Sequence, residues 1–222
     1  MFVYYENIFQ SIAFLCGLVA FRAIRPLYLQ WLVPLLGITV LNEVVIVPYM
    51  MRHFHASRDL AYNIFSLLDM GTWLYIFFRV HKGRWIQKWI IPAVSVIYLS
   101  SLIEMYLKGW TILHTNSFRL YEIVILLLSC SYLYSILKKE YHKLIPDPLF
   151  WISAACITYH SMLFLLFTTL AEHSYWYFKG ADEVFNYLQI VGNVFYYLFL
   201  SFAFITCIKS RSKMSKTDFY QD

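Results

Sequence analysis

Ionisable and amide side chains occur inside several long apolar stretches of this sequence, where such groups are rare. Asp69 lies near the middle of LAYNIFSLLDMGTWLYIFF, residues 60–78, a stretch otherwise apolar enough to cross a bilayer. Because an ionisable group is costly in lipid, its presence there usually marks a functional site. The candidate ligand-binding residues chosen on this basis are Glu43, Asp69, Glu104, Glu122, His160, Gln189 and Asn193.

The chemistry of these residues is that of an acidic site without its own cation. Away from their ends, the apolar stretches that hold them contain no Lys or Arg. Carboxylates in such surroundings hold protons or pair with an external cation. We therefore expect at least one of Glu43 and Asp69 to be protonated at neutral pH when no ligand is bound, and a cationic ligand, a metal ion or protons to supply the missing partner.

The composition indicates a membrane protein with several spanning helices. Of the 222 residues, 60% are hydrophobic, 20% are aromatic and only 14% are charged, and the mean hydropathy is +0.57. Ordinary soluble domains do not reach these values. The net charge of +5 comes from short basic groups between apolar segments, which indicates membrane orientation and excludes nucleic acid as the expected partner. The four cysteines have no metal-binding spacing, and we predict no cofactor.

Seven apolar segments each come near the roughly 20 residues that a spanning helix requires. We predict an all-α bundle of seven transmembrane helices over residues 1–208 and a short polar cytoplasmic tail over residues 209–222. The N-terminal residues lack the basic start of a cleaved signal peptide, so they should remain as the first helix. The predicted helices cover residues 2–21, 29–51, 60–79, 89–107, 119–137, 149–171 and 186–208.

The basic residues are distributed unevenly between the two ends of these segments. Thirteen of the 18 Lys and Arg residues fall on the side that holds the C-terminus. By the positive-inside rule, this asymmetry predicts an N-terminus outside and a C-terminus in the cytoplasm. Asp147 and Pro148 predict the start of the sixth helix, as an N-cap followed by proline at the first helical position. Pro34 is expected to kink the second helix.

Helical spacing places polar residues on one face of each segment from the third onward. In the third segment Tyr62, Ser66, Asp69 and Trp73 recur at the spacing of one helical face. At 1.5 Å per residue, Glu43 and Asp69 lie about 12 and about 14 Å below the outer ends of their helices. Since polar faces avoid lipid, we expect them to line an outward-open cavity formed by the second to seventh helices.

The same residues also have structural interpretations. Hydrogen bonds between transmembrane helices contribute about 0.6 kcal/mol each on average, which explains Asn193 without a ligand. Glu104 and Glu122 lie close enough to the outer end to reach water, and His160 fits a hydrogen-bonded interior histidine. The two deep carboxylates of the second and third segments lack a basic partner, so their presence favours a functional role.

Known classes of seven-helix protein restrict the function further. Retinal proteins require a lysine within the seventh helix, and the only lysine there, Lys209, lies at its cytoplasmic end, which excludes this class. Zinc hydrolases of the ceramidase type require several histidines within the membrane, whereas six of the seven histidines here lie in loops or at helix ends. A carrier with a 3+1+3 helix arrangement would superimpose residues 62–78 on residues 186–202, with Asp69 over Asn193.

Two stretches resemble a known group of membrane proteins. YNIFSLLDMGTWLYIFF at residues 62–78 and DPLFWISAACITYHSMLFLLF at residues 147–167 are similar to a group of small uncharacterised seven-helix membrane proteins common in Bacteroidota. The length and the number of helices match that group over nearly the whole chain. The resemblance implies a seven-helix fold in a cell membrane, expected to be a bacterial inner membrane. It transfers no catalytic residue, because the group has no established activity.

Three functions are compatible with these features. The first, which we favour, is a receptor-like or accessory signalling protein that binds a small polar or cationic ligand from outside and transmits a helix movement to a membrane or cytoplasmic partner. The alternative is a small-solute carrier, although polar residues become sparse beyond His160 and Ser153. The second alternative is a metal-dependent intramembrane hydrolase.

Overall fold

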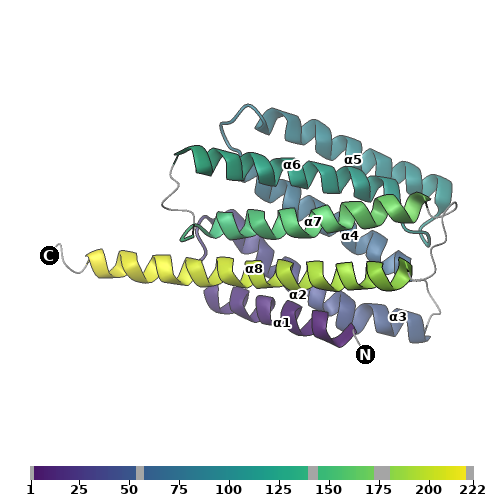
Figure 1. The fold of residues 1–222 in the computed structure, drawn as a ribbon, viewed down its shortest axis with the longest axis horizontal. Helices are drawn as coiled ribbons and strands as arrows, with labels where there is room; N and C mark the ends of the chain where they lie inside the picture. The colour runs from purple at the N-terminus through teal and green to yellow at the C-terminus, as the bar shows by residue number, and fades with distance from the viewer. Residues whose placement is uncertain (1–2, 54–57, 140–144, 173–180, 219–222) are drawn as a thin grey trace.

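The protein folds as an all-α bundle (Figure 1). The computed structural model describes residues 3–53, 58–139, 145–172 and 181–218, and every regular element among them is helical. Seven helical rods lie side by side. The second rod consists of η1 (Leu27–Trp31), α2 (Leu32–Leu41), η2 (Asn42–Ile46) and α3 (Val47–His53). The others are α1 (Val3–Ala20), α4 (Arg58–Val80), α5 (Gln87–Lys108), α6 (Thr115–Lys139), α7 (Pro148–Glu172) and α8 (Ala181–Asp218).

Five of these rods are long and apolar enough to cross a bilayer, which makes the chain a multi-pass helical membrane protein. They are the second rod, α5, α6, α7 and α8. Helix α1 is apolar but shorter over its described side chains. Helix α4 has a sufficient length of 23 residues, but Asn63, Ser66 and Asp69 lower its hydropathy. The seven predicted segments correspond to the seven rods, and the largest difference is at the end of the last.

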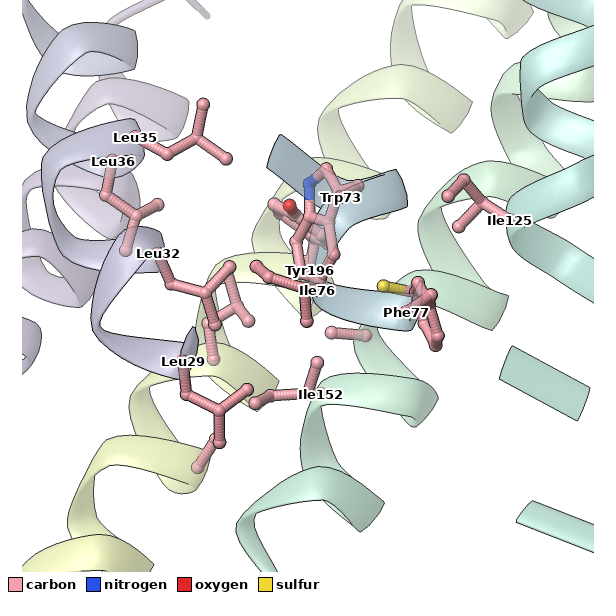
Figure 2. Close-up of a cluster of buried hydrophobic side chains, with 14 of the residues drawn as sticks. Leu29, Leu32, Leu35, Leu36, Trp73, Ile76, Phe77, Ile125, Ile152 and Tyr196 are labelled. Carbon is pink, nitrogen blue, oxygen red and sulfur yellow. The ribbon is translucent and has the colours of Figure 1, made fainter. Parts of the chain in front are cut away.

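Helix α4 occupies a central position, which explains how it accommodates its polar residues. It packs against the second rod, α5 and α6, while α1 packs between the second rod and α8, and α7 between α6 and α8. Figure 2 shows Trp73 and Ile76 of α4 among Leu32, Ile152 and Tyr196, which come from three other rods. Trp73 and Ile76 are both fully buried. The polar residues one and two turns earlier in α4 therefore point between helices and not into lipid.

The second rod changes helix type at two places. A 3-10 segment, η1, precedes α2, and a π-helical turn, η2, precedes α3. Pro48 accounts for the π-helical turn, because proline lacks an amide hydrogen and clashes with the carbonyl four residues earlier, and a wider turn removes that clash. Pro34, where a kink was predicted, instead lies in the first turn of α2, where the missing amide hydrogen costs nothing. The π-helical turn contains Glu43.

Helix α8 is longer than the sequence predicted. The prediction ended the helix at residue 208 and assigned residues 209–222 to a polar tail, whereas the helix continues to Asp218. The segment from Lys209 to Asp218 contains neither Gly nor Pro, so no residue in it interrupts the helix. Its C-terminal part extends beyond the other helices in Figure 1, at the end of the bundle opposite the N-terminus.

The connection between α5 and α6 is fixed by a buried amide from α4. Gly109 ends α5 with φ of +83°, a conformation that favours glycine. Asn63 is fully buried, and its Nδ2 donates to the carbonyls of Trp110 and Ile112, each at 2.8 Å. These bonds hold the connection against the first half of α4.

The start of α7 agrees with its sequence signal. The helix begins at Pro148, and a carboxylate oxygen of Asp147 accepts a hydrogen bond from the amide of Leu149 at 2.9 Å. This geometry confirms the predicted N-cap followed by proline.

Candidate functional site

A cavity of about 350 Å³ lies in the half of the bundle nearest the N-terminus. Its volume is near the lower limit of ordinary ligand pockets, roughly 300–1,000 Å³. Asp59 in the first turn of α4 and Leu113 in the α5–α6 connection line it, so the cavity reaches this end of the bundle. Six of the seven candidate residues chosen from the sequence line this one cavity: Glu43, Asp69, Glu122, His160, Gln189 and Asn193.

The wall of the cavity differs from the prediction in two helices. Glu6, Asn7 and Gln10 of α1 line it, and among the described lining residues none comes from α5. Asn193 of α8 donates through Nδ2 to a carboxylate oxygen of Glu6 at 3.0 Å. Glu6 and Gln10 are four residues apart and share a helical face, so the spacing that identified the other segments would also have identified them.

Glu122 and His160 form a buried pair in the wall of the cavity. Both residues are 1% exposed, and Nδ1 of His160 is hydrogen-bonded to a carboxylate oxygen of Glu122. The edge of the Tyr121 ring packs against His160, with 5.5 Å between ring centroids. Nε2 of His160 has no hydrogen-bond partner among the residues that the structure describes. A carboxylate that holds one imidazole nitrogen in this way fixes the ring and leaves the other nitrogen available for a ligand.

Asp69 and Glu43 each accept a hydrogen bond from a tyrosine. The hydroxyl of Tyr121 donates to Asp69, and that of Tyr62 donates to Glu43, both at 3.0 Å. Both carboxyl groups are only partly buried, because they face the cavity. A phenol stabilises a carboxylate but cannot neutralise its charge.

The cavity is acidic overall. None of its described lining residues is Lys or Arg. Carboxyl groups that are close together in low dielectric disfavour one another's ionisation, so an external cation or protons must offset their charge. The carboxyl groups that line the cavity are those of Glu6, Glu43, Asp59, Asp69 and Glu122.

Aromatic rings form part of the cavity wall and continue into the core beside it. Phe118 and Phe167 stack in the wall, 5.0 Å apart and 10° from parallel. One turn of α4 beyond Asp69, Trp73 packs against Tyr196 at 6.3 Å between centroids, and Tyr196 packs against Tyr159 at 4.6 Å. We call Trp73, Tyr159 and Tyr196 the aromatic floor. Figure 2 shows Trp73 and Tyr196 of this group close together in the buried core.

Glu104, the seventh candidate, lies outside the cavity and stabilises the start of α6. Its carboxylate accepts hydrogen bonds from the amide and hydroxyl of Ser117 at 2.8 and 2.5 Å, and from the amide of Asn116 at 3.3 Å. Lys108 forms an ion pair with it at 2.7 Å. The geometry is that of a helix N-cap supplied by a neighbouring helix.

A second polar cluster lies at the opposite end of the bundle. Tyr132 donates to Asp147 at 3.1 Å, Arg84 donates to Ser135 at 2.8 Å, and the Arg84 guanidinium lies 5.7 Å from the centre of the Tyr132 ring. His81 is fully buried beside them, and burial lowers the pKa of its imidazole. The neutral ring donates from Nδ1 to the backbone carbonyl four residues earlier, at 3.0 Å. Along α4, Trp73 of the aromatic floor lies between Asp69, which lines the cavity, and His81 of this cluster, which directly follows the helix.

Two further observations bear on identity. In the described part of the chain, no group of three or more His, Cys, Asp or Glu side chains is arranged to hold a metal ion. Comparisons of the sequence and the structure with models of protein families, with curated proteins and with solved structures find no match. The resemblance to the seven-helix group of Bacteroidota therefore remains a prediction.

Proposed function

We propose that this protein is a receptor-like membrane protein that binds a small polar or cationic molecule in its acidic cavity. The observation that carries the proposal is the convergence of five carboxyl groups from four rods on one cavity whose described lining contains no Lys or Arg. Maintaining such a site within apolar helices is costly, and a bound ligand is the usual reason for it. The cavity volume of about 350 Å³ suits a small organic molecule.

In this proposal all seven rods span the membrane and the cavity opens to the outside. Helix α1 begins and helix α8 ends at opposite ends of the bundle (Figure 1), as an odd number of passes requires. The excess of Lys and Arg on the side of the C-terminus supports a cytoplasmic C-terminus.

Reporter fusions test this orientation. Alkaline phosphatase fused after Asp222 should be inactive, because the enzyme folds only outside the cytoplasm, and a fluorescent protein at the same position should be bright. The same phosphatase fused in front of residue 1 with an export signal should be active. An active C-terminal phosphatase would show that the number of spans or the orientation is wrong.

A signal could leave the cavity through α8. This helix contributes Gln189 and Asn193 to the cavity and then continues past the aromatic floor to Asp218. A ligand that contacts these residues in only one of two arrangements of α8 would shift the population toward that arrangement. A partner protein would then detect the position of the opposite end of this helix.

Neutral isosteres of the two accessible carboxylates test the binding site. Purified protein in detergent is screened for small polar compounds that raise its melting temperature, since a ligand at 100 times its Kd stabilises by about 2.7 kcal/mol. Asp69→Asn and Glu43→Gln should abolish this shift for the compounds found, while the unliganded variants melt at or above the wild-type temperature, because a neutral isostere keeps the side-chain shape and removes the cost of holding carboxyl groups close together in low dielectric.

The matched control is Asp222→Asn, which makes the same chemical change at the last residue of the chain. It should respond to ligand as the wild type does. If Asp69→Asn and Glu43→Gln both melt several degrees lower and still respond, the two carboxylates are structural and the cavity is not the site.

A small-solute carrier is the second candidate, favoured by the polar cluster of His81, Arg84, Tyr132, Ser135 and Asp147 at the opposite end of the bundle. An alternating-access protein needs polar groups on both sides of a closed barrier, and the aromatic floor would be that barrier. Uptake of a compound from the thermal screen into proteoliposomes would move this candidate ahead of the receptor. Binding without uptake would support the receptor over the carrier.

A further inference from the structure

Two hydrogen-bonded pairs in the cavity are joined into one titrating group. Tyr121 binds Asp69, and the next residue of α6, Glu122, binds His160. The Tyr121 ring also packs directly against the His160 ring. Ionisable groups so close together exchange protons as a set, so Asp69, Glu122 and His160 share one protonation equilibrium.

The charge of this group determines how many protons it holds when the cavity has no ligand. With both carboxyl groups ionised and the imidazole neutral, Asp69, Glu122 and His160 would carry two negative charges in low dielectric, which is strongly disfavoured. Two protons neutralise them. One belongs to the buried Glu122–His160 pair, and the other belongs to Asp69, which is the only member of the group with part of its surface accessible to the cavity.

The surrounding ionisable side chains do not change this count, because all of them are acids. They come from α1, the second rod, α4, α5, α7 and α8. They are Glu6, Glu43, Asp59, Tyr62, Tyr98, Cys156, Tyr159, Tyr196 and Tyr197. The carboxylates among them attract cations and oppose ionisation of Asp69.

Two buried donors define a second feature of the site. When Glu122 and His160 share a proton through Nδ1, Nε2 of His160 carries a hydrogen. His160 lines the cavity and is 1% exposed, and this N–H has no acceptor among the described residues. The same holds for Nε2 of Gln10, which is 2% exposed. A buried donor without an acceptor is costly, so a ligand oxygen is expected to face them.

Size and aromatic content distinguish an organic cation from a metal ion. A cavity of about 350 Å³ is far larger than one bare ion, and the structure arranges no set of three metal ligands in its described part. The stacked faces of Phe118 and Phe167 and the ring of Tyr159 line the same space. Aromatic faces attract organic ammonium groups and bury the apolar body of such a ligand.

Building on the proposed binding function, we infer that the ligand is a small organic ammonium ion with an oxygen acceptor, and that its binding releases the proton of Asp69. The O–H bond of the Asp69 carboxyl group breaks, and the proton passes through the cavity to outside water. The ammonium N–H groups then donate to the carboxylate that remains. The ligand oxygen accepts from His160 Nε2. The group loses one positive charge with the proton and regains one with the ammonium ligand, so the total charge of the group with its ligand equals that of the group before binding.

Three related probes separate the features of this ligand: tyramine carries an ammonium group and an oxygen, 2-phenylethylamine carries only the ammonium group, and 2-(4-hydroxyphenyl)ethanol carries only oxygen. Isothermal titration calorimetry at pH 7 should show tyramine binding most tightly. Because 2-phenylethylamine lacks one hydrogen bond, its affinity should be lower than that of tyramine by up to roughly tenfold. Because the alcohol lacks the charge, its affinity should be lower than that of tyramine by more than roughly tenfold.

Proton release is read by repeating the tyramine titration in phosphate and in Tris buffers, whose ionisation enthalpies differ. Wild-type protein should release up to about one proton per ligand, and its affinity should rise by up to roughly tenfold per pH unit while Asp69 is protonated. Asp69→Asn should bind tyramine more weakly and release no proton. Asp222→Asn should match the wild type.

Several results would overturn this inference while leaving a ligand-binding cavity in place. They are equal affinity for tyramine and the neutral alcohol, tyramine binding without proton release, or binding of none of the three probes when the thermal screen yields neutral or anionic ligands. The wild-type titrations decide these cases even if Asp69→Asn fails to fold. A thermal screen without any ligand would instead count against the proposed function itself.

Discussion

Glu104→Ala is expected to lower the free energy of unfolding by about 3 kcal/mol. The 5%-exposed carboxylate accepts three hydrogen bonds at the start of α6 and pairs with Lys108. Loss of a helix cap costs about 1 kcal/mol, and a buried partner that loses a charged hydrogen bond costs about 1.5–3 kcal/mol. Ser117, fully buried, cannot recover this loss from water.

Unfolding of purified protein in detergent by denaturant measures the effect. Lys108→Ala is the control, because its side chain is 38% exposed and an exposed ion pair contributes only about 0–1 kcal/mol. Glu104→Gln keeps a hydrogen-bond acceptor, so its free energy of unfolding should lie between those of the wild type and Glu104→Ala. Equal destabilisation by Glu104→Ala and Lys108→Ala would show that the ion pair matters and the cap does not. Ligand affinity should be unchanged in Glu104→Gln, since this side chain does not line the cavity.

Trp73→Ala should be still more destabilising, by about 3–5 kcal/mol, the usual cost of deleting a large buried ring. Trp73 is fully buried in the centre of the bundle and forms the part of the aromatic floor nearest Asp69. Its loss should also deepen the cavity toward the opposite end. Trp73→Phe should restore most of the stability, because it retains a ring.

Trp85→Ala is the matched control for this change, since Trp85 is 72% exposed and its loss should leave stability nearly unaffected. Thermal unfolding compares the three variants. If Trp73→Ala and Trp85→Ala melt at the same temperature, the floor does not hold the bundle together. In proteoliposomes, leakage of small cations through Trp73→Ala but not through Trp85→Ala would identify the floor as the barrier between the two halves.

Much of this arrangement could be predicted because apolar length and helical spacing are local properties of the chain. A 20-residue apolar segment specifies a helix, and the spacing of Tyr62, Ser66, Asp69 and Trp73 specifies one face of it. Polar faces must avoid lipid, so they converge. That reasoning chose seven candidate residues without any knowledge of helix order, and six of them line the cavity.

The misplacement of Glu104 has a different origin, because a helical face does not reveal which neighbour it meets. Glu104 is on a polar face of α5, but that face lies against the first turn of α6, where free backbone amides provide partners. The same limitation hid the Glu122–His160 pair, whose members are 38 residues apart and depend on the relative rotation of α6 and α7.

Other differences arose where local signals compete. Pro34 and Pro48 are both candidates for distorting the second rod. Pro34, in the first turn of α2, had the smaller effect, and the π-helical turn lies beside Pro48. The change from apolar to charged residues at Lys209 marks the end of an apolar segment. It does not mark the end of a helix, because Lys, Arg and Met continue the helical backbone in water as well as in lipid.

Because α8 is unbroken, a small tilt at one of its ends becomes a larger displacement at the other. Its 38 residues correspond to about 57 Å at 1.5 Å per residue. The cavity lies near one end, so a tilt of about 5° pivoting there would displace the other end by about 4 Å, given this rise per residue. A movement too small to change the packing around Asn193 would thus become comparable to the width of an atom at Asp218, where a partner protein could detect it.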